Sequence, residues 1–554
     1  MTIILSMLRL IAPLLLLATP ALAEEPNGKA GHDDLIATFM DFQKYQSTPV
    51  DDYGPVNTNR RIDQLAAFQT RLNDMGVARW SIPDKVDWLV VRARMDESEF
   101  VLRVTRPWAR DPGFYIGPMQ TLAFTALPLN PDNIEAFRAR LRDISKVLAT
   151  AQRQLTDVAS DHADLAIRSL TQSDGVEDGY PYRATPPAGV IGWFKDFRER
   201  ASASQPELLP EIDQASAALQ AYRKFLIQNR PGWTGRAGVG EAALNWYLGN
   251  VLLMPYSATE IVTLGQRELD RLWGFYALER NRNRALPELT LASGDADYKQ
   301  RLADTDGRVR RFLIEQQFMT IPANIPSDWR KMIAPPTYTE PFNVPFITRA
   351  TPPNYWEQVQ FRDPSPDHLH AVIPGHRFDA LMASQNPNPI RSRVNDGARW
   401  QGWAVYLEES ALQAGFFDDR PRVRELIYLF GLWRAARTIG DVWNQRNERT
   451  AAEVADYWLK MTPLLDADVA RKYAHIRTIP GHGLEYTIGN VQMWALLAER
   501  KRQLGDKFVL KDFHDTFIAK GRIPISLIRY EMTGNQTDVT RFFNRQPLSK
   551  VINP

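Results

Sequence analysis

Cysteine is absent from this chain of 554 residues. Its absence excludes disulfide bonds, zinc sites built on thiolates, and cysteine nucleophiles. A chain without cysteine tolerates an oxidising compartment but does not require one. Candidate sites must therefore be sought among the other side chains.

The chain also lacks an excess of charge of one sign, since 67 basic residues stand against 65 acidic ones and the net charge is +2. The two signs are interspersed along the sequence. No single-sign field therefore favours nucleic acid or an anionic membrane. We expect no nucleic-acid partner.

Long apolar runs are lacking beyond the N-terminus, because charged side chains interrupt every later stretch before the roughly 18 residues that a membrane helix needs. At the N-terminus, Arg9 precedes a short apolar run over residues 10–18, and the small-residue site Ala21-Leu22-Ala23 follows. This pattern predicts a signal peptide over residues 1–23, with a retained anchor as the alternative. We expect a soluble mature protein in the periplasm or secreted, with no membrane contact after cleavage.

Strand-like alternation is sparse, and apolar residues instead recur every three or four positions, the period of an amphipathic helix. This period predicts helices over Arg61–Met75, Val86–Val104, Asn133–Leu155, Gln214–Gln228 and Ala258–Arg280. Ser257 is the expected N-cap of the last helix. We therefore expect a mainly α fold with a few short strands. The proline-rich stretch 321–353 is the place for them, either as strands or as extended crossings over a cleft.

The length alone would allow about two to four ordinary domains. We expect one large helical domain over residues 24–554, on the basis of the family resemblance described below. Glycine and proline cluster at residues 229–240, which is the best candidate seam or else a long loop. The seam would divide the domain into an N-terminal helical part, about residues 24–235, and a part of about residues 236–554 that carries the site.

Histidines are grouped in the second part: five of the eight are His368, His370, His376, His475 and His482. Imidazole is the commonest side-chain metal ligand, so the grouping raises a metal hypothesis. The competing interpretation is that these histidines cap helices, form hydrogen bonds or lie at the surface. No Gly-x-Ser-x-Gly elbow and no His-Glu-x-x-His motif is present to suggest another chemistry.

The spacing of His370 and His376 places their side chains about 120° apart on a regular helix, too far to share one ion. Pro374 removes a helical hydrogen bond and clashes with the carbonyl four residues before it, at His370. The resulting kink would let both rings face one cleft. Asp379, three residues after His376, is the expected carboxylate that orients its imidazole.

The segment from His370 to His376 resembles the His-Glu-x-x-Pro-Gly-His signature of the uncharacterised-domain family DUF885. Other segments resemble the family's patterns in the same order: Asp87–Tyr115, Gly402–Glu408, Arg437–Asp441, Pro480–Gly489 and Phe513–Pro524. The resemblance covers most of the mature chain. It implies an α-rich, gluzincin-like metallopeptidase with zinc as the candidate cofactor and a peptide or small molecule as the ligand.

The resemblance also implies the members of the site. The expected metal ligands are His370, His376, Gln401 and Glu408. Gln401 and Glu408 lie about 10.5 Å apart along one helix face, so only one of them is expected to contact the metal. The expected catalytic residues are His482, Glu485, Tyr486 and Arg437, of which His482 and Glu485 depart from the family's pattern and add an imidazole and a carboxylate to the expected site wall. Arg437 and Asp441, four residues apart, are a candidate helix pair, although that spacing is ordinary by itself. The expected substrate-binding residues are Trp400, Trp403 and Tyr406, for which packing in the core is the competing interpretation.

Two departures from the family's pattern affect the chemistry. The glutamate that follows the first histidine of the signature is Ala371, and the acidic residue before Gly402-Trp403 is Gln401. A zinc hydrolase needs a base for the metal-bound water, and a methyl group cannot accept that proton. Three hypotheses remain: an exported hydrolase of peptide or amide bonds with an altered site, a non-catalytic pseudopeptidase that binds a peptide or small ligand, and an enzyme recruited for a non-peptidase reaction.

Overall fold

The computed structural model describes residues 28–50, 52–172, 187–328, 352–475 and 480–552. The expected signal peptide, residues 1–23, lies outside the described residues. Helices dominate the described part of the chain, as the sequence predicts. Its β structure is one isolated bridge between Ala159 and Gly235, so the expected short strands are wrong there. Most of the proline-rich stretch, residues 329–351, falls outside the described residues.

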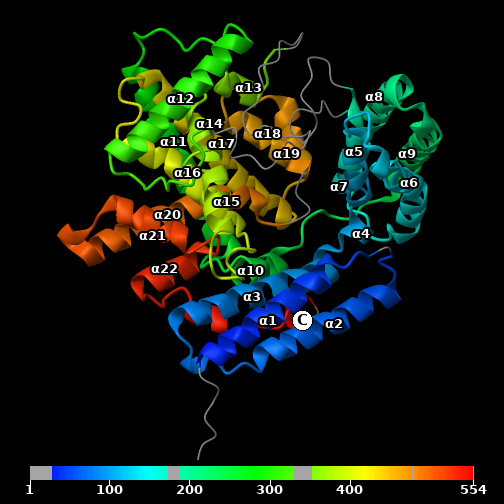
Figure 1. Ribbon diagram of the computed structural model, residues 1–554, viewed down its shortest axis with the longest axis horizontal. Helices are drawn as coiled ribbons and strands as arrows, with labels where there is room; N and C mark the ends of the chain where they lie inside the picture. The colour runs from blue at the N-terminus through cyan, green and yellow to red at the C-terminus, as the bar shows by residue number, and fades with distance from the viewer. Residues whose placement is uncertain (1–27, 51, 173–186, 329–351, 476–479, 553–554) are drawn as a thin grey trace, which may run out of the picture.

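The first three helices lie side by side along one edge of the molecule (Figure 1). They are α1 (Gly28–Ser47), α2 (Pro55–Asn73) and α3 (Ile82–Phe100). α3 also contacts the C-terminal part of the chain, where Arg391 pairs with Asp87 at 2.8 Å and Arg545 pairs with Asp96 at 2.8 Å. These buried and half-buried ion pairs tie α3 to the second half of the chain.

A second group of helices stands on one side of the molecule (Figure 1). It contains α4 (Pro107–Arg110), α5 (Gly113–Ala123), α6 (Ile134–Gln154), α7 (Ser160–Thr171), α8 (Gly189–Ser204) and α9 (Leu209–Asn229). The buried residues of α6, which include Leu141, Ile144 and Leu148, recur every three or four positions and form one apolar stripe. The stripe packs α6 against α9.

The remaining helices form the largest group and carry the site. They are α10 (Glu241–Asn250), α11 (Ala258–Arg282), α12 (Asp295–Glu315), α13 (Tyr355–Gln360), α14 (Ser365–Ala371), α15 (His376–Ser384), α16 (Gly397–Gln413), α17 (Pro421–Gln445), α18 (Ala451–Met461), α19 (Ala467–His475), α20 (His482–Leu504), α21 (Leu510–Ala519), α22 (Ile525–Thr533) and α23 (Ser549–Ile552). All five helices expected from periodicity are confirmed, as α2, α3, α6, α9 and α11. Ser257 caps α11 through a reciprocal capping box with Glu260.

α17 is the central helix of this group, since most of its side chains are buried on every face. It packs against α11, α18 and α20, while α20 packs in turn against α16. The last contact requires glycine, because a Cβ added to Gly402 would lie 2.4 Å from the backbone of Gly489. This close approach brings the start of α16 beside the start of α20.

The predicted division near residue 235 falls in the connection between α9 and α10, and it stays a prediction. Within the described ranges, no helix is both long enough and apolar enough to cross a membrane.

Candidate functional site

The site is built around a break in the chain between α14 and α15. α14 ends at Ala371 and α15 begins at His376, with Pro374 between them. The Ile373–Pro374 peptide bond is cis. Gly375 is required here, because a Cβ at this position would lie 1.9 Å from the carbonyl oxygen of His370. The break therefore folds the backbone tightly against the end of α14.

The break brings His370 and His376 together. The centroids of their rings are 4.6 Å apart, and the ring planes cross at 82°. The expected convergence of the two side chains is therefore present, although a regular helix would point them apart. Their role as metal ligands stays a prediction.

His370 is held from one side by a buried ion pair between α16 and α17. Its Nδ1 lies 2.7 Å from Oε1 of Glu408, and Oε2 of Glu408 accepts a hydrogen bond of 2.5 Å from Nη1 of Arg434. A carboxylate only accepts hydrogen bonds, so we assign the ring proton to Nδ1 and leave Nε2 as an acceptor. Glu408, expected to be a metal ligand, thus lies behind the ring and orients it.

His376 differs from His370 in its surroundings. Its ring packs edge to face on Trp400 at 4.9 Å, and its Nδ1 is buried without a hydrogen-bond partner among the described residues. The expectation that the Asp379 carboxylate orients the His376 imidazole is wrong. Asp379 instead accepts a hydrogen bond of 2.9 Å from Arg399, and both side chains of this pair are buried. A buried carboxylate is stabilised best by a cation, so the arginine takes the place of the imidazole.

Both histidines are neutral at pH 7. Burial lowers the pKa of His370 well below its ordinary value, and Arg434 and Arg437 lower it further. Burial also lowers the pKa of His376, with contributions from His370, Arg434 and Arg522.

Gln401 faces both rings, and its contact with each of them opposes the lowering of the pKa. Its Oε1 atom is buried without a hydrogen-bond partner in the described part of the chain. Gln401 thus lies beside two neutral imidazoles, and its contacts with them leave the acceptor oxygen without a well-formed hydrogen bond.

The first turns of α20 form the opposite wall of the site. The ring of Tyr486 lies parallel to that of His370 at 6.5 Å, and His482 contacts Tyr486 at 5.7 Å. The guanidinium of Arg437 lies 4.5 Å from the centre of the Tyr486 ring. The expected pairing of Arg437 with Asp441 is not found among the described residues, where Asp441 accepts a 2.8 Å hydrogen bond from the backbone amide of Gly483.

Glu485 lies near this wall but against the N-terminus of α16. A Cβ added to Gly397 would lie 2.2 Å from its carboxylate, and Oε2 of Glu485 is 3.7 Å from Nδ1 of His482. A carboxylate at a helix N-terminus is stabilised by the helix dipole. This position favours a structural contribution of Glu485 to the start of α16.

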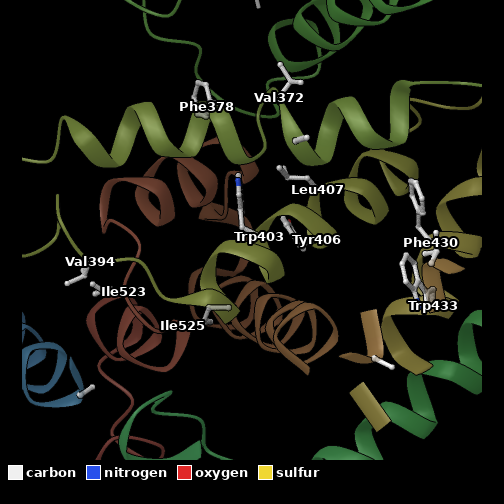
Figure 2. Close-up of a cluster of buried hydrophobic side chains, with 14 of the residues drawn as sticks. Val372, Phe378, Val394, Trp403, Tyr406, Leu407, Phe430, Trp433, Ile523 and Ile525 are labelled. Carbon is white, nitrogen blue, oxygen red and sulfur yellow. The ribbon is translucent and has the colours of Figure 1, made fainter. Parts of the chain in front are cut away.

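Two of the three aromatic residues expected to bind substrate lie in the core. Trp403 and Tyr406 have no exposed surface, and Figure 2 shows both among buried apolar side chains beneath the break between α14 and α15. Nε1 of Trp403 donates to the carbonyl of Pro374 at 3.0 Å, and the Tyr406 hydroxyl lies 2.8 Å from Nε2 of His514. The structure therefore favours the packing interpretation for both and leaves Trp400, which is half-buried, beside the histidine pair.

Arg434 is the site residue that the sequence interpretation missed. The available signal was its position inside the apolar run from Leu426 to Ala436, where a charge needs a buried partner. Asp367 was also missed. Burial raises its pKa to about 7, and the nearby Glu408 adds to the shift.

The comparison with protein families identifies the chain. The family described as "Bacterial protein of unknown function (DUF885)" matches residues 36–532. The chain belongs to the DUF885 family. No curated protein matches it.

Two solved structures share the fold of this DUF885 member. A candidate lipoprotein of unknown function from Shewanella oneidensis matches with a TM-score of 0.65 and 18% identity, over 91% of this chain and 98% of that one. A candidate lipoprotein from Colwellia psychrerythraea matches with a TM-score of 0.65 and 16% identity, over 94% and 100% of the two chains. At this level of identity the likeness concerns the fold alone.

Proposed function

We propose that this DUF885 protein is an exported, non-catalytic binding protein that holds a peptide or small molecule against the His370–His376 pair. The observation that carries the proposal is the chemistry beside the pair. Hydrolysis needs a group that accepts a proton from water, and the position that follows His370 is the buried methyl group of Ala371. Nδ1 of His376 and Oε1 of Gln401, which form no full hydrogen bond among the described residues, can instead form hydrogen bonds with a ligand.

The zinc expected from the family resemblance fits these residues poorly. Glu408, the carboxylate in contact with His370, is already paired with Arg434. Arg434, Arg437 and Arg522 lower the pKa of one or both imidazoles, so the local field disfavours a dication. Among the described residues, no group of three or more His, Asp or Glu side chains is arranged to hold a metal ion. The proposal therefore assigns no step to a metal.

A second candidate is an altered hydrolase of gluzincin-like architecture that acts on peptide or amide bonds. One observation favours it: the Glu408 carboxylate holds Nδ1 of His370 as the supporting carboxylates of metal sites do. In this case the scaffold of a metal site would remain while its anionic ligand and its base are replaced.

The two candidates are separated by restoring the missing carboxylates. The mature wild-type chain is compared with the double variant Ala371→Glu and Gln401→Glu for bound zinc, by plasma mass spectrometry, and for cleavage of a peptide library. We expect no turnover and substoichiometric zinc in the wild type, and zinc near one equivalent in the double variant. Turnover by the wild type that is lost in His376→Ala would establish the hydrolase instead.

The binding itself is tested by calorimetry with the same peptides. We expect binding by the wild type that weakens about tenfold or more in His376→Ala, since a fully desolvated polar contact contributes about 1–3 kcal/mol.

Glu24 is the expected first residue of the exported form, which N-terminal sequencing of the periplasmic fraction checks. The proposed export rests on the N-terminal pattern and on the names of the two structural relatives.

A further inference from the structure

Arg437 is a buried guanidinium with no ion-pair partner among the residues that the structure describes. Its exposed fraction is 2%, and its Nε and Nη2 atoms have no hydrogen-bond partner among the described residues. Asp441, one turn later on α17, is turned to the backbone of Gly483 instead. Arg434, three residues earlier on the same helix, is paired with Glu408. Of these two arginines on α17, Arg434 thus has a carboxylate partner and Arg437 has none in the described part of the chain.

Aromatic rings surround the guanidinium of Arg437. It lies 4.5 Å from the centre of Tyr486, 4.9 Å from Tyr473 and 5.2 Å from Trp433. Such contacts stabilise a desolvated guanidinium. They do not offset the larger penalty for burying an unpaired ion, and a guanidinium cannot avoid that penalty by losing its proton. The rings orient the cation without neutralising it.

We propose that Arg437 recognises an oxyanion of the bound ligand, a carboxylate or a phosphate group that lies beside Tyr486. This assignment rests on the proposed ligand-binding function and names the chemical group that the ligand must carry. The fork of the guanidinium donates two parallel hydrogen bonds to such a group. Tyr473 and Tyr486, whose rings lie against the guanidinium, are each half-buried, as is His482, which contacts Tyr486.

The same geometry sets the span that a ligand must bridge. The Arg437 guanidinium lies 4.5 Å from the centre of the Tyr486 ring, which lies 6.5 Å from that of His370, so the separation of Arg437 from His370 is at most that of about three extended residues. A short peptide with a free C-terminal carboxylate therefore reaches from Arg437 to the histidine pair. Its amide groups would then meet the unused atoms of Gln401 and His376.

The test uses the full mature chain and three probes: N-acetyl-dialanine, its C-terminal amide, and inorganic phosphate. Binding is followed by calorimetry and by the thermal unfolding midpoint. We expect the free acid to bind at least tenfold more tightly than the amide, and phosphate to compete with it. Arg437→Met keeps an apolar stem between the rings and should abolish both the preference and the competition. Arg449→Met is the matched control, since Arg449 is an exposed arginine 4.1 Å from the Trp443 ring.

The stability of Arg437→Met separates ligand recognition from a purely structural role, which predicts a lower unfolding temperature. If Arg437 recognises a ligand, Arg437→Met without ligand should unfold at the same temperature as the wild type or higher, because an unpaired buried charge has been removed. A lower midpoint together with unchanged binding would overturn the assignment. Arg437→Lys provides a second variant that keeps the charge but loses the fork, and it should reduce the preference for the acid without removing it.

The outcomes separate this assignment from the proposed function. Equal binding of acid and amide, weakened alike in His376→Ala, would overturn the oxyanion assignment and leave the binding function standing. Binding of phosphate or the free acid that depends on Arg437 but not on His376 would support the assignment and remove the proposed role of the histidine pair.

Discussion

The two sides of the histidine pair differ in how completely their polar groups are paired. On one side, which we call the paired side, His370, Glu408 and Arg434 contact one another at 2.5–3.2 Å. On the other, the open side, His376, Gln401 and Arg437 each keep buried polar atoms without a partner among the described residues. Arg434 and Arg437 stand less than one turn apart on α17, yet they fall on different sides.

The difference teaches where a ligand would be recognised. Groups that are already satisfied stabilise the fold and offer nothing further to a ligand, whereas a buried polar group without a partner can still form a hydrogen bond. The paired side therefore accounts for the position of His370. The open side accounts for the hydrogen-bonding capacity of the site.

The largest expected effect comes from breaking the paired side with Arg434→Met. The variant leaves the Glu408 carboxylate buried without a cation, and the loss of one partner of such a pair costs about 3–5 kcal/mol. Urea unfolding at pH 7 measures the loss. Adding Glu408→Gln to the same chain should restore much of the stability. If Arg434→Met alone were as stable as the wild type, the ion pair of the paired side would not stabilise the fold.

A second expected effect is a loss of stability in acid. His514, a buried histidine that belongs to neither the paired side nor the open side, serves as the reference. Burial lowers the pKa of His514 to about 4, although its contact with the Phe318 carbonyl opposes the shift. Between about pH 6.5 and 4, His514 therefore binds a proton in the unfolded chain but not in the folded chain. The free energy of unfolding should fall by about 3 kcal/mol over this window because of His514 alone.

His370 and His376 add to this loss with the same sign, since the pKa of each is also lowered by burial. Unfolding by urea at pH 7, 5.5 and 4.5 measures the slope, and His514→Gln should reduce it. His32→Gln is the control with the opposite sign, because a hydrogen bond to Asp87 raises the pKa of His32. Its removal should weaken the protein at low pH and steepen the fall. Equal slopes in all three chains would contradict the assignment of neutral buried histidines.

The sequence predicted what depends on neighbours along the chain. The five periodic stretches are helices, Ser257 caps α11, and the segment around Pro374 interrupts the helix so that His370 and His376 meet. Each of these features follows from residues within about two turns of one another. Local rules for periodicity, capping and proline apply at that range.

The partners across helices were not predicted. Arg434 reaches His370 from 64 residues away, and Arg399 reaches Asp379 from 20. The sequence pattern does not show which cation a buried carboxylate will meet, because the choice depends on how the helices pack. For the same reason Trp403 and Tyr406, which share the family motif, are found in the core, and Glu408 is found behind the ring of His370.

The smallest expected effect sharpens the comparison with two matched variants, His370→Leu and His376→Leu. His370→Leu removes a hydrogen bond to a carboxylate, which contributes about 1.5–3 kcal/mol. His376→Leu replaces a ring whose Nδ1 has no partner in the described structure with an apolar side chain, so the free energy of unfolding should change by about 1 kcal/mol or less. The effect on ligand binding should differ from the effect on stability: His376→Leu keeps the stability but loses the hydrogen bond to the ligand. Equal destabilisation by the two variants would mean that His376 has a structural partner, and the open side would then lose one of its three members.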